Sequence, residues 1–300
     1  DTFYVWYTKV LEAGPGYPEG YNGTLWFATS EDGSVWTERG EALGRGAEDK
    51  FDAFGVFTPN ILYAPTTGKY YLYYTGVRVD DDKGWDFKKF SGSIGVAVAE
   101  APDGGPQGWQ RCNDGDPVLV PRLGEAGVFD GWHTDDTVMF YRDHQYWFYY
   151  KGHSLEGQLE GTGLPPGTTP MGLARSDRPD GGFERIPFSE SQPFLLQPGH
   201  ELLLWPYGEG VLSLPTGHYR PEHPADFSLH YSPDGLAFSV ASAVIPETKQ
   251  GESSGLRAPG LYRPDLTNPG EPYSGPLWGL CMTGYRPHAG LQRFVLDLGD

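Results

Sequence analysis

The sequence predicts an all-β protein that folds as a single five-bladed β-propeller over residues 1–300. Three observations support this fold class. Forty-three glycines and 27 prolines are spread along the chain without a period, which favours many short strands joined by tight turns. An aromatic strand pattern recurs three times, and a strand that runs into an Asp-Gly turn recurs four times. Repeats built only of strands are typical of propeller blades.

The first repeated element is an aromatic stretch. It reads DTFYVWYTKV at residues 1–10, GKYYLYYTGV at 68–77 and HQYWFYYKGH at 144–153. Runs of this length that are rich in Tyr, Phe and Trp favour strands. Each copy should therefore form the same strand in three successive blades.

The second repeated element is a strand that ends in an Asp-Gly turn. Its four copies, TLWFATSEDG, GVAVAEAPDG, MGLARSDRPDG and FSLHYSPDG, place their aspartates at Asp32, Asp103, Asp180 and Asp234. A short strand follows each turn, so each unit holds about four strands, the content of one blade. A last unit with three strand patterns, LRAPGLYRP, PLWGLCMTGY and LQRFVLDL, completes five blades.

A third element precedes the aromatic strand in the second and third units. FDAFGVFTPNILYAPTTG and FDGWHTDDTVMFYRDH align without gaps from Phe51 and Phe129, so that Thr58 falls opposite Asp136. In a propeller this entry strand is the innermost one of its blade. The first unit shows no such segment before its aromatic strand. We therefore expect the first blade to be incomplete at Asp1.

Composition excludes several classes of partner. The 22 Lys and Arg against 40 Asp and Glu give a net charge of −18, which repels nucleic acid and anionic membranes and favours a neutral ligand. The sequence contains no apolar run of about 18 residues, the length that would predict a membrane span. Cys112 and Cys281 fit no metal-ligand spacing and are expected to remain thiols, with a long-range disulfide as the alternative. No metal or other cofactor is expected.

Three residues are candidates for catalysis because they bring ionisable groups to predicted inner strands. Asp136 is a carboxylate where the repeat has Thr58, so the blade does not require an acid there. His200 and Glu201 stand directly before the apolar strand of the fourth unit. Hydrolysis of a glycosidic bond needs one group to protonate the leaving oxygen and another to activate water or attack the sugar.

Each of these residues also has a structural alternative. Asp136 would cap a turn, His200 would be a buried core histidine, and Glu201 would pair with an arginine. Together, on the inner strands of adjacent blades, they favour an active site.

Four further residues are candidates for contacts with a substrate. Trp132 and Trp205 lie next to the polar candidates, and an indole ring can stack on the face of a sugar. Thr58 occupies the Asp136 position of the second blade. Asp52 heads the inner segment, although its repeat partner Asp130 does the same, and this recurrence favours a shared turn-capping role.

Several of these stretches together resemble a known family. FTPNILY, FDGWHTDDTVMFYRDHQYWFYYKG, GHELLLWPY and SPDGLAFSV are similar to the five-bladed propellers of glycoside hydrolase family 117, which is related in fold to families 43, 32 and 68. The resemblance implies an exo-acting, inverting hydrolase that removes 3,6-anhydro-L-galactose from neoagaro-oligosaccharides. It also implies a periplasmic or extracellular location.

The resemblance assigns roles by position. Asp136 matches a carboxylate that tunes its neighbours, His200 matches the general acid, and Glu201 matches a second essential residue. The family motif His-Asp-Pro reads Asp135-Asp136-Thr137 here, so both flanks differ. The family's general base would lie upstream of Asp1. Its N-terminal dimerisation segment is also not matched, which leaves oligomerisation open.

Two alternatives remain open at this stage. One is an arabinan- or xylan-type glycosidase of the family 43 kind. The other is a carbohydrate-binding propeller without catalytic activity. All three readings share an oligosaccharide as the ligand.

Overall fold

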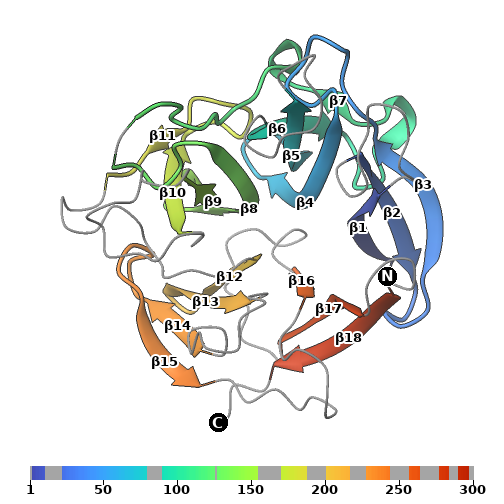
Figure 1. Ribbon diagram of the computed structural model, residues 1–300. Helices are drawn as coiled ribbons and strands as arrows, with labels where there is room; N and C mark the ends of the chain where they lie inside the picture. The colour runs from blue at the N-terminus through green and yellow to red at the C-terminus, as the bar shows by residue number, and fades with distance from the viewer. Residues whose placement is uncertain are drawn as a thin grey trace.

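The computed structural model describes residues 2–10, 22–79, 90–125, 127–154, 170–187, 201–216, 228–243, 257–263, 277–283 and 290–296. Within these ranges the protein is built of antiparallel strands, and helical structure is limited to two three-residue 3₁₀ turns, η2 (Gly105–Gln107) and η3 (Asn113–Gly115). The strands form five sheets arranged in a ring (Figure 1). The predicted five-bladed propeller is confirmed.

In each sheet, neighbouring strands are consecutive in the sequence. The first contains β1 (Phe3–Val10), β2 (Gly23–Ser30) and β3 (Thr37–Leu43). The second contains β4 (Gly55–Ala64), β5 (Lys69–Val79), β6 (Phe90–Ala99) and β7 (Gln110–Arg111). The third contains β8 (His133–Arg142), β9 (Gln145–His153), β10 (Met171–Ser176) and β11 (Glu184–Arg185). The fourth contains β12 (Glu201–Tyr207), β13 (Gly210–Thr216), β14 (Ser228–Ser232) and β15 (Ser239–Ala243). The fifth contains β16 (Arg257–Leu261), β17 (Leu277–Thr283) and β18 (Gly290–Leu296).

The sequence repeats correspond to repeated strands. The three aromatic stretches form β1, β5 and β9, and the Asp-Gly strands form β2, β6, β10 and β14. Side-chain hydrogen bonds explain the turns: an Asp32 carboxylate oxygen accepts the backbone N–H groups of Ser34 and Val35, both at 2.8 Å. Gly33 has a φ of 70°, which glycine adopts without steric cost.

The core lies between neighbouring sheets and is rich in aromatic residues. Tyr73 of β5 and Phe148 of β9 are fully buried, and their ring centroids lie 5.9 Å apart. Such rings remove large apolar areas from water and favour tilted contacts of this kind. Cys112 and Cys281 are not joined by a disulfide, as expected.

The first and fifth sheets meet through aromatic side chains. The Phe3 ring of β1 packs edge-on against Tyr262 at 5.5 Å and against Trp278 of β17 at 5.7 Å. In Figure 1 these two sheets lie next to each other and close the ring. The expectation that the first blade lacks an inner strand stays a prediction. Among the described residues, no helix is long and apolar enough to cross a membrane.

The strands nearest the centre of the ring position the candidate site. β4, β8, β12 and β16 are the first strands of their sheets, and Figure 1 shows them around the middle of the molecule. Each sheet is then built outward in the same order. The inner strands consequently begin at the same face of the propeller.

Candidate active site

Asp136 lies at a bulge in the inner strand β8. The pairing of β8 with β9 shifts register between Asp135 and Thr137, and Asp136 adopts a φ of 41°. A residue other than glycine is uncommon in this left-handed region, and bulges often redirect a side chain at a functional site. The carboxylate is largely buried, with 13% of the side chain exposed.

Thr58 has the same geometry in the second blade. The register between β4 and β5 shifts between Phe57 and Asn60, and Thr58 has a φ of 49°. The structure therefore places Thr58 and Asp136 at equivalent points of neighbouring inner strands, as the gap-free sequence alignment predicted.

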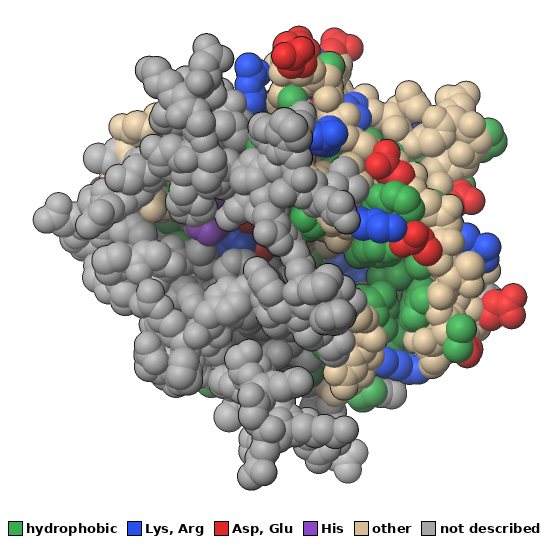
Figure 2. Space-filling model, turned by 45° about the vertical axis from the view of Figure 1, so that its right-hand side comes forward, with side chains coloured by type: hydrophobic (Ala, Val, Ile, Leu, Met, Phe, Trp, Pro, Cys, Tyr) green, Lys and Arg blue, Asp and Glu red, His purple; other side chains and the backbone are tan. Residues whose placement is uncertain are grey.

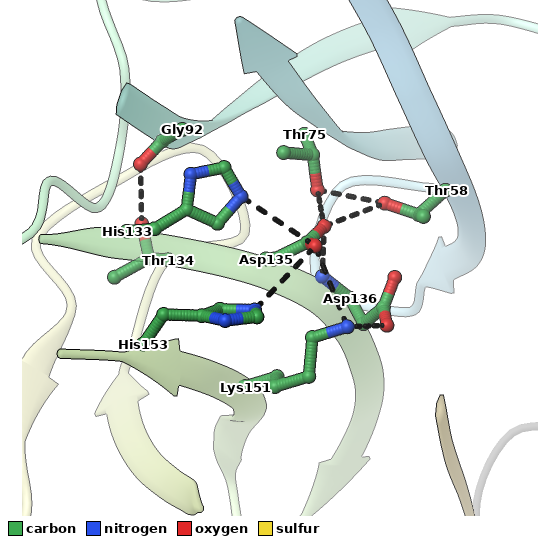
Figure 3. A network of polar contacts seen from close by, with 9 residues as sticks. All are labelled: Thr58, Thr75, Gly92, His133, Thr134, Asp135, Asp136, Lys151 and His153. Carbon is green, nitrogen blue, oxygen red and sulfur yellow. Dashed lines mark hydrogen bonds and ion pairs between the residues drawn. The ribbon is translucent and has the colours of Figure 1, made fainter. Parts of the chain in front are cut away.

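Asp135 lies at the centre of a polar network that spans two blades (Figure 3). One of its carboxylate oxygens accepts the Thr75 hydroxyl of the second blade at 2.7 Å and the backbone N–H of Asp136 at 2.8 Å. The Thr58 hydroxyl lies 3.5 Å from the same oxygen. This carboxylate therefore ties the bulge of the third blade to the strands of the second.

The other Asp135 oxygen faces three basic side chains. It lies 3.4 Å from Nζ of Lys151, 3.5 Å from Nε2 of His133 and 4.0 Å from Nε2 of His153. The Lys151 ammonium also pairs with the carboxylate of Asp136. Figure 2 shows histidine, basic and acidic side chains together toward the middle of one face. The network thus gathers charge where the inner strands meet.

Electrostatics keep Asp135 ionised. Burial alone would raise the pKa of its carboxyl, but the Lys151 ammonium, followed by the His133 and His153 imidazoles, holds that pKa well below its usual value. Only 1% of the Lys151 side chain is exposed. A buried ion pair of this kind is stable only when its partners are well placed.

Three residues of the network could hold a metal ion. Ligand atoms of His133, Asp135 and His153 all lie within 4.8 Å of one another. Two imidazoles and a carboxylate form a donor set that suits zinc and related divalent ions. The Lys151 ammonium already contacts the same Asp135 oxygen, so this carboxylate has a cationic partner within the chain itself.

A glycine in the neighbouring blade leaves room for the His133 ring. A Cβ atom at Gly92 of β6 would overlap that ring, and the Thr134 hydroxyl donates a 3.3 Å hydrogen bond to the Gly92 carbonyl. The second blade therefore shapes the site through its backbone as well as through Thr75.

Sequence reasoning missed His133, Lys151 and His153. Two signals in the sequence point to His133 and Lys151. His133 and Asp135 alternate on a predicted inner strand, where a buried strand would carry apolar residues. Lys151 replaces the threonine that the aromatic repeat has at Thr75.

The two predicted tryptophans lie in the core. Trp205 of β12 is 2% exposed and packs with Leu203 and Leu212, while Trp132 is 7% exposed and packs with Val77. A sugar ring needs an accessible aromatic face for stacking. These positions favour packing over contact with a substrate.

Asp52 also lies away from solvent. Its carboxylate is fully buried and accepts hydrogen bonds from the Tyr74 hydroxyl at 2.9 Å and from Nε of Arg111 at 2.8 Å. Its repeat partner Asp130 has the same kinds of partner. This placement favours the structural role that the recurrence suggested.

The remaining candidates are His200 and Glu201. His200 lies outside the described residues. Glu201 is the first residue of β12, paired in register with Thr216, and its side chain also lies outside the description. β12 is the neighbour of β8, since Leu204 and Val138 share one core cluster. Glu201 and Asp136 therefore stand near the starts of adjacent inner strands.

Comparison with solved structures shows the relatives of this propeller. Zg3597, a family 117 glycoside hydrolase from the marine bacterium Zobellia galactanivorans, is 27% identical, with a TM-score of 0.73 over 97% of this chain and 80% of that one. The resemblance to family 117 is confirmed. It supports the predicted enzyme class, a glycosidase.

More distant neighbours share the fold. An α-L-arabinofuranosidase, CtGH43, from Clostridium thermocellum is 15% identical, with a TM-score of 0.55 over 97% of this chain and 85% of that one. The GH32 β-fructofuranosidase BmSUC1 of Bombyx mori is 12% identical, with a TM-score of 0.56 over 95% of this chain and 53% of that one. No family model and no curated protein sequence matches the chain.

Proposed function

We propose that the chain is an exo-acting glycoside hydrolase that releases a terminal sugar of the 3,6-anhydro-L-galactose type from neutral oligosaccharides. The observation that carries the proposal is the likeness to Zg3597 over 97% of the chain. A net charge of −18 agrees with an uncharged substrate. A periplasmic or extracellular location forms part of the proposal, because polysaccharide fragments are met there.

The roles of the site residues follow the resemblance. His200 donates a proton to the leaving oxygen, Glu201 is the second essential group, and Asp136 tunes both from the adjacent inner strand. Lys151 supports this role because its ammonium keeps a negative charge favourable at Asp136. An inverting mechanism needs room for a water molecule, with the two carboxyl groups roughly 6.5 to 9.5 Å apart.

A second candidate is an arabinan- or xylan-type glycosidase. Two observations favour it: Asp135 and Thr137 differ from the His-Asp-Pro motif of family 117, and the propeller shares its fold with an arabinofuranosidase. Asp135 anchors the bulge that carries Asp136. A change at this position therefore bears directly on the shape of the sugar site.

A substrate panel separates these candidates. The protein is incubated with neoagarobiose, neoagarotetraose and the 4-nitrophenyl derivatives of α-L-arabinofuranose and β-D-xylose, and the released sugars are identified by chromatography. Release of 3,6-anhydro-L-galactose supports the first candidate, and release of a pentose supports the second. Sugar binding without any hydrolysis would instead indicate a binding propeller. For an active substrate, NMR of the first-formed anomer tests inversion.

A further inference from the structure

The contact between Asp136 and Lys151 has a neutral counterpart in the second blade. Thr58 matches Asp136 at the bulge, and Thr75 matches Lys151 in the aromatic repeat. The hydroxyl groups of Thr58 and Thr75 are hydrogen-bonded to each other at 2.7 Å. The same two positions of the blade thus carry a hydroxyl pair in one copy and an ion pair in the next.

The register of the aromatic strands supports this equivalence. Tyr74 and Tyr150 directly precede Thr75 and Lys151, and their hydroxyl groups both bond to a buried aspartate, at 2.9 Å and 3.0 Å. The strands β5 and β9 are therefore aligned on the same internal contact. At the next residue the two strands therefore share the same backbone position and differ only in the side chain.

An ammonium group at this depth is not required by the fold. Burying an ion costs several kcal/mol unless it is well paired, and a neutral pair often replaces a buried ion pair without loss of stability. The hydroxyl pair of the second blade shows that this backbone accommodates a neutral contact. The charge at Lys151 therefore serves something other than blade packing.

We propose that Lys151 is a positioning residue, which holds the Asp136 carboxylate in one orientation at the candidate active site. The inference rests on the proposed function. Lys151 is itself held in place, since its ammonium also faces Asp135, which the Thr75 hydroxyl anchors from the second blade. In Figure 3 the two imidazoles lie to the left of Asp135, and the Lys151 ammonium lies below it, beside the Asp136 carboxylate. Asp136 thus has a fixed cationic partner from β9.

Kinetics of Lys151 variants test the proposal. Lys151→Met removes the charge and keeps most of the volume, and we expect kcat to fall about 10²-fold, since misplacing a reacting group by roughly 1 Å has that effect. KM should change by less than a few-fold, because the lost interaction acts in the transition state. Lys151→Arg, which keeps the charge, should recover part of the loss. Lys69→Met removes an exposed lysine paired with Glu100 and serves as the control.

A double-mutant cycle measured by thermal unfolding tests the pair without an activity assay. Lys151→Thr alone leaves two carboxylates without their shared cation and should lower Tm by several degrees. Adding Asp136→Thr recreates the hydroxyl pair of the second blade and should restore part of the loss. Strictly additive losses would overturn the pairing, and wild-type kcat in Lys151→Met would overturn the positioning role. Absence of turnover in the wild type would contradict the proposed function itself, while the cycle still tests the pair.

Discussion

Asp52 and Asp130 occupy the same place in neighbouring blades, and each carboxylate is fully buried against an arginine of the outermost strand of its sheet. Nε of Arg111 on β7 lies 2.8 Å from Asp52, and Nε of Arg185 on β11 lies 2.9 Å from Asp130. The arrangement ties the segment that leads into each inner strand to the outer edge of the same blade. It fixes where β4 and β8 begin.

Removal of one of these carboxylates should destabilise the protein. Asp130→Ala leaves the partly buried guanidinium groups of Arg122 and Arg185 without the carboxylate that they share. The free energy of unfolding should fall by about 3 kcal/mol, the lower end of the range for a broken buried pair, because both guanidinium groups retain some access to water. Urea unfolding measures the effect. Replacing the exposed Asp116, which pairs with Lys50, should change stability by less than about 1 kcal/mol. An equal effect of both substitutions would contradict the stabilising role of the buried Asp130 carboxylate.

The close approach of Gly92 to His133 gives a second prediction. Gly92→Ala should displace the imidazole, disturb its contact with Asp135 and lower kcat by about 10-fold or more. Gly260→Ala on β16 is the matched control, since among the described residues no atom lies within 4 Å of a Cβ built there. Steady-state kinetics and thermal melts of both variants check this. Wild-type kcat in Gly92→Ala would show that the His133 position does not matter for turnover.

The Asp-Gly turns predict a pH dependence of stability. Backbone N–H groups of Ala237 and Leu236 donate to the Asp234 carboxylate and hold its pKa below the usual value. Because the folded pKa is the lower one, this stabilisation is present above the unfolded pKa of about 4 and is lost as the pH falls through the folded pKa. Asp234→Ala should therefore lower Tm by a few degrees at pH 7 and by less at pH 2.5.

Asp234→Asn separates charge from hydrogen bonding in this turn. The amide oxygen still accepts the two backbone N–H groups, but it does not titrate in this range. Its Tm difference from Asp234→Ala should therefore vary little with pH. A wild-type advantage over Asp234→Ala that grows toward acid pH would reverse the predicted sign.

The fold could be predicted because the blade is a local unit that repeats. The aromatic stretch at 68–77 and the strand β5 at Lys69–Val79 agree closely, since a dense run of aromatic residues is a local signal for a strand. The equivalence of Thr58 and Asp136 also followed from a gap-free alignment. The structure adds the shared positive φ that explains why the two residues leave the strand pattern.

The site was less predictable because its contacts are distant in sequence. Asp135 stood out only as a changed flank of a motif, yet its role depends on Thr75, which is 60 residues away, and on Lys151 in the next strand. Trp132 and Trp205 were chosen for their polar neighbours in sequence. How deeply a side chain is buried depends on how the blades pack, and polar neighbours in the sequence do not indicate that depth.

The central claim is that the starts of β8 and β12 form a glycosidase site around Asp136, and one substitution tests it most directly. Asp136→Thr introduces the residue that the second blade carries at Thr58, while Asp135 remains as a partner for Lys151. Circular dichroism should show a folded protein with a cooperative melt. On the best substrate of the panel, we predict that kcat/KM falls at least about 10²-fold, the typical effect of losing a group that supports acid–base catalysis. Undiminished hydrolysis by the folded variant would contradict the account.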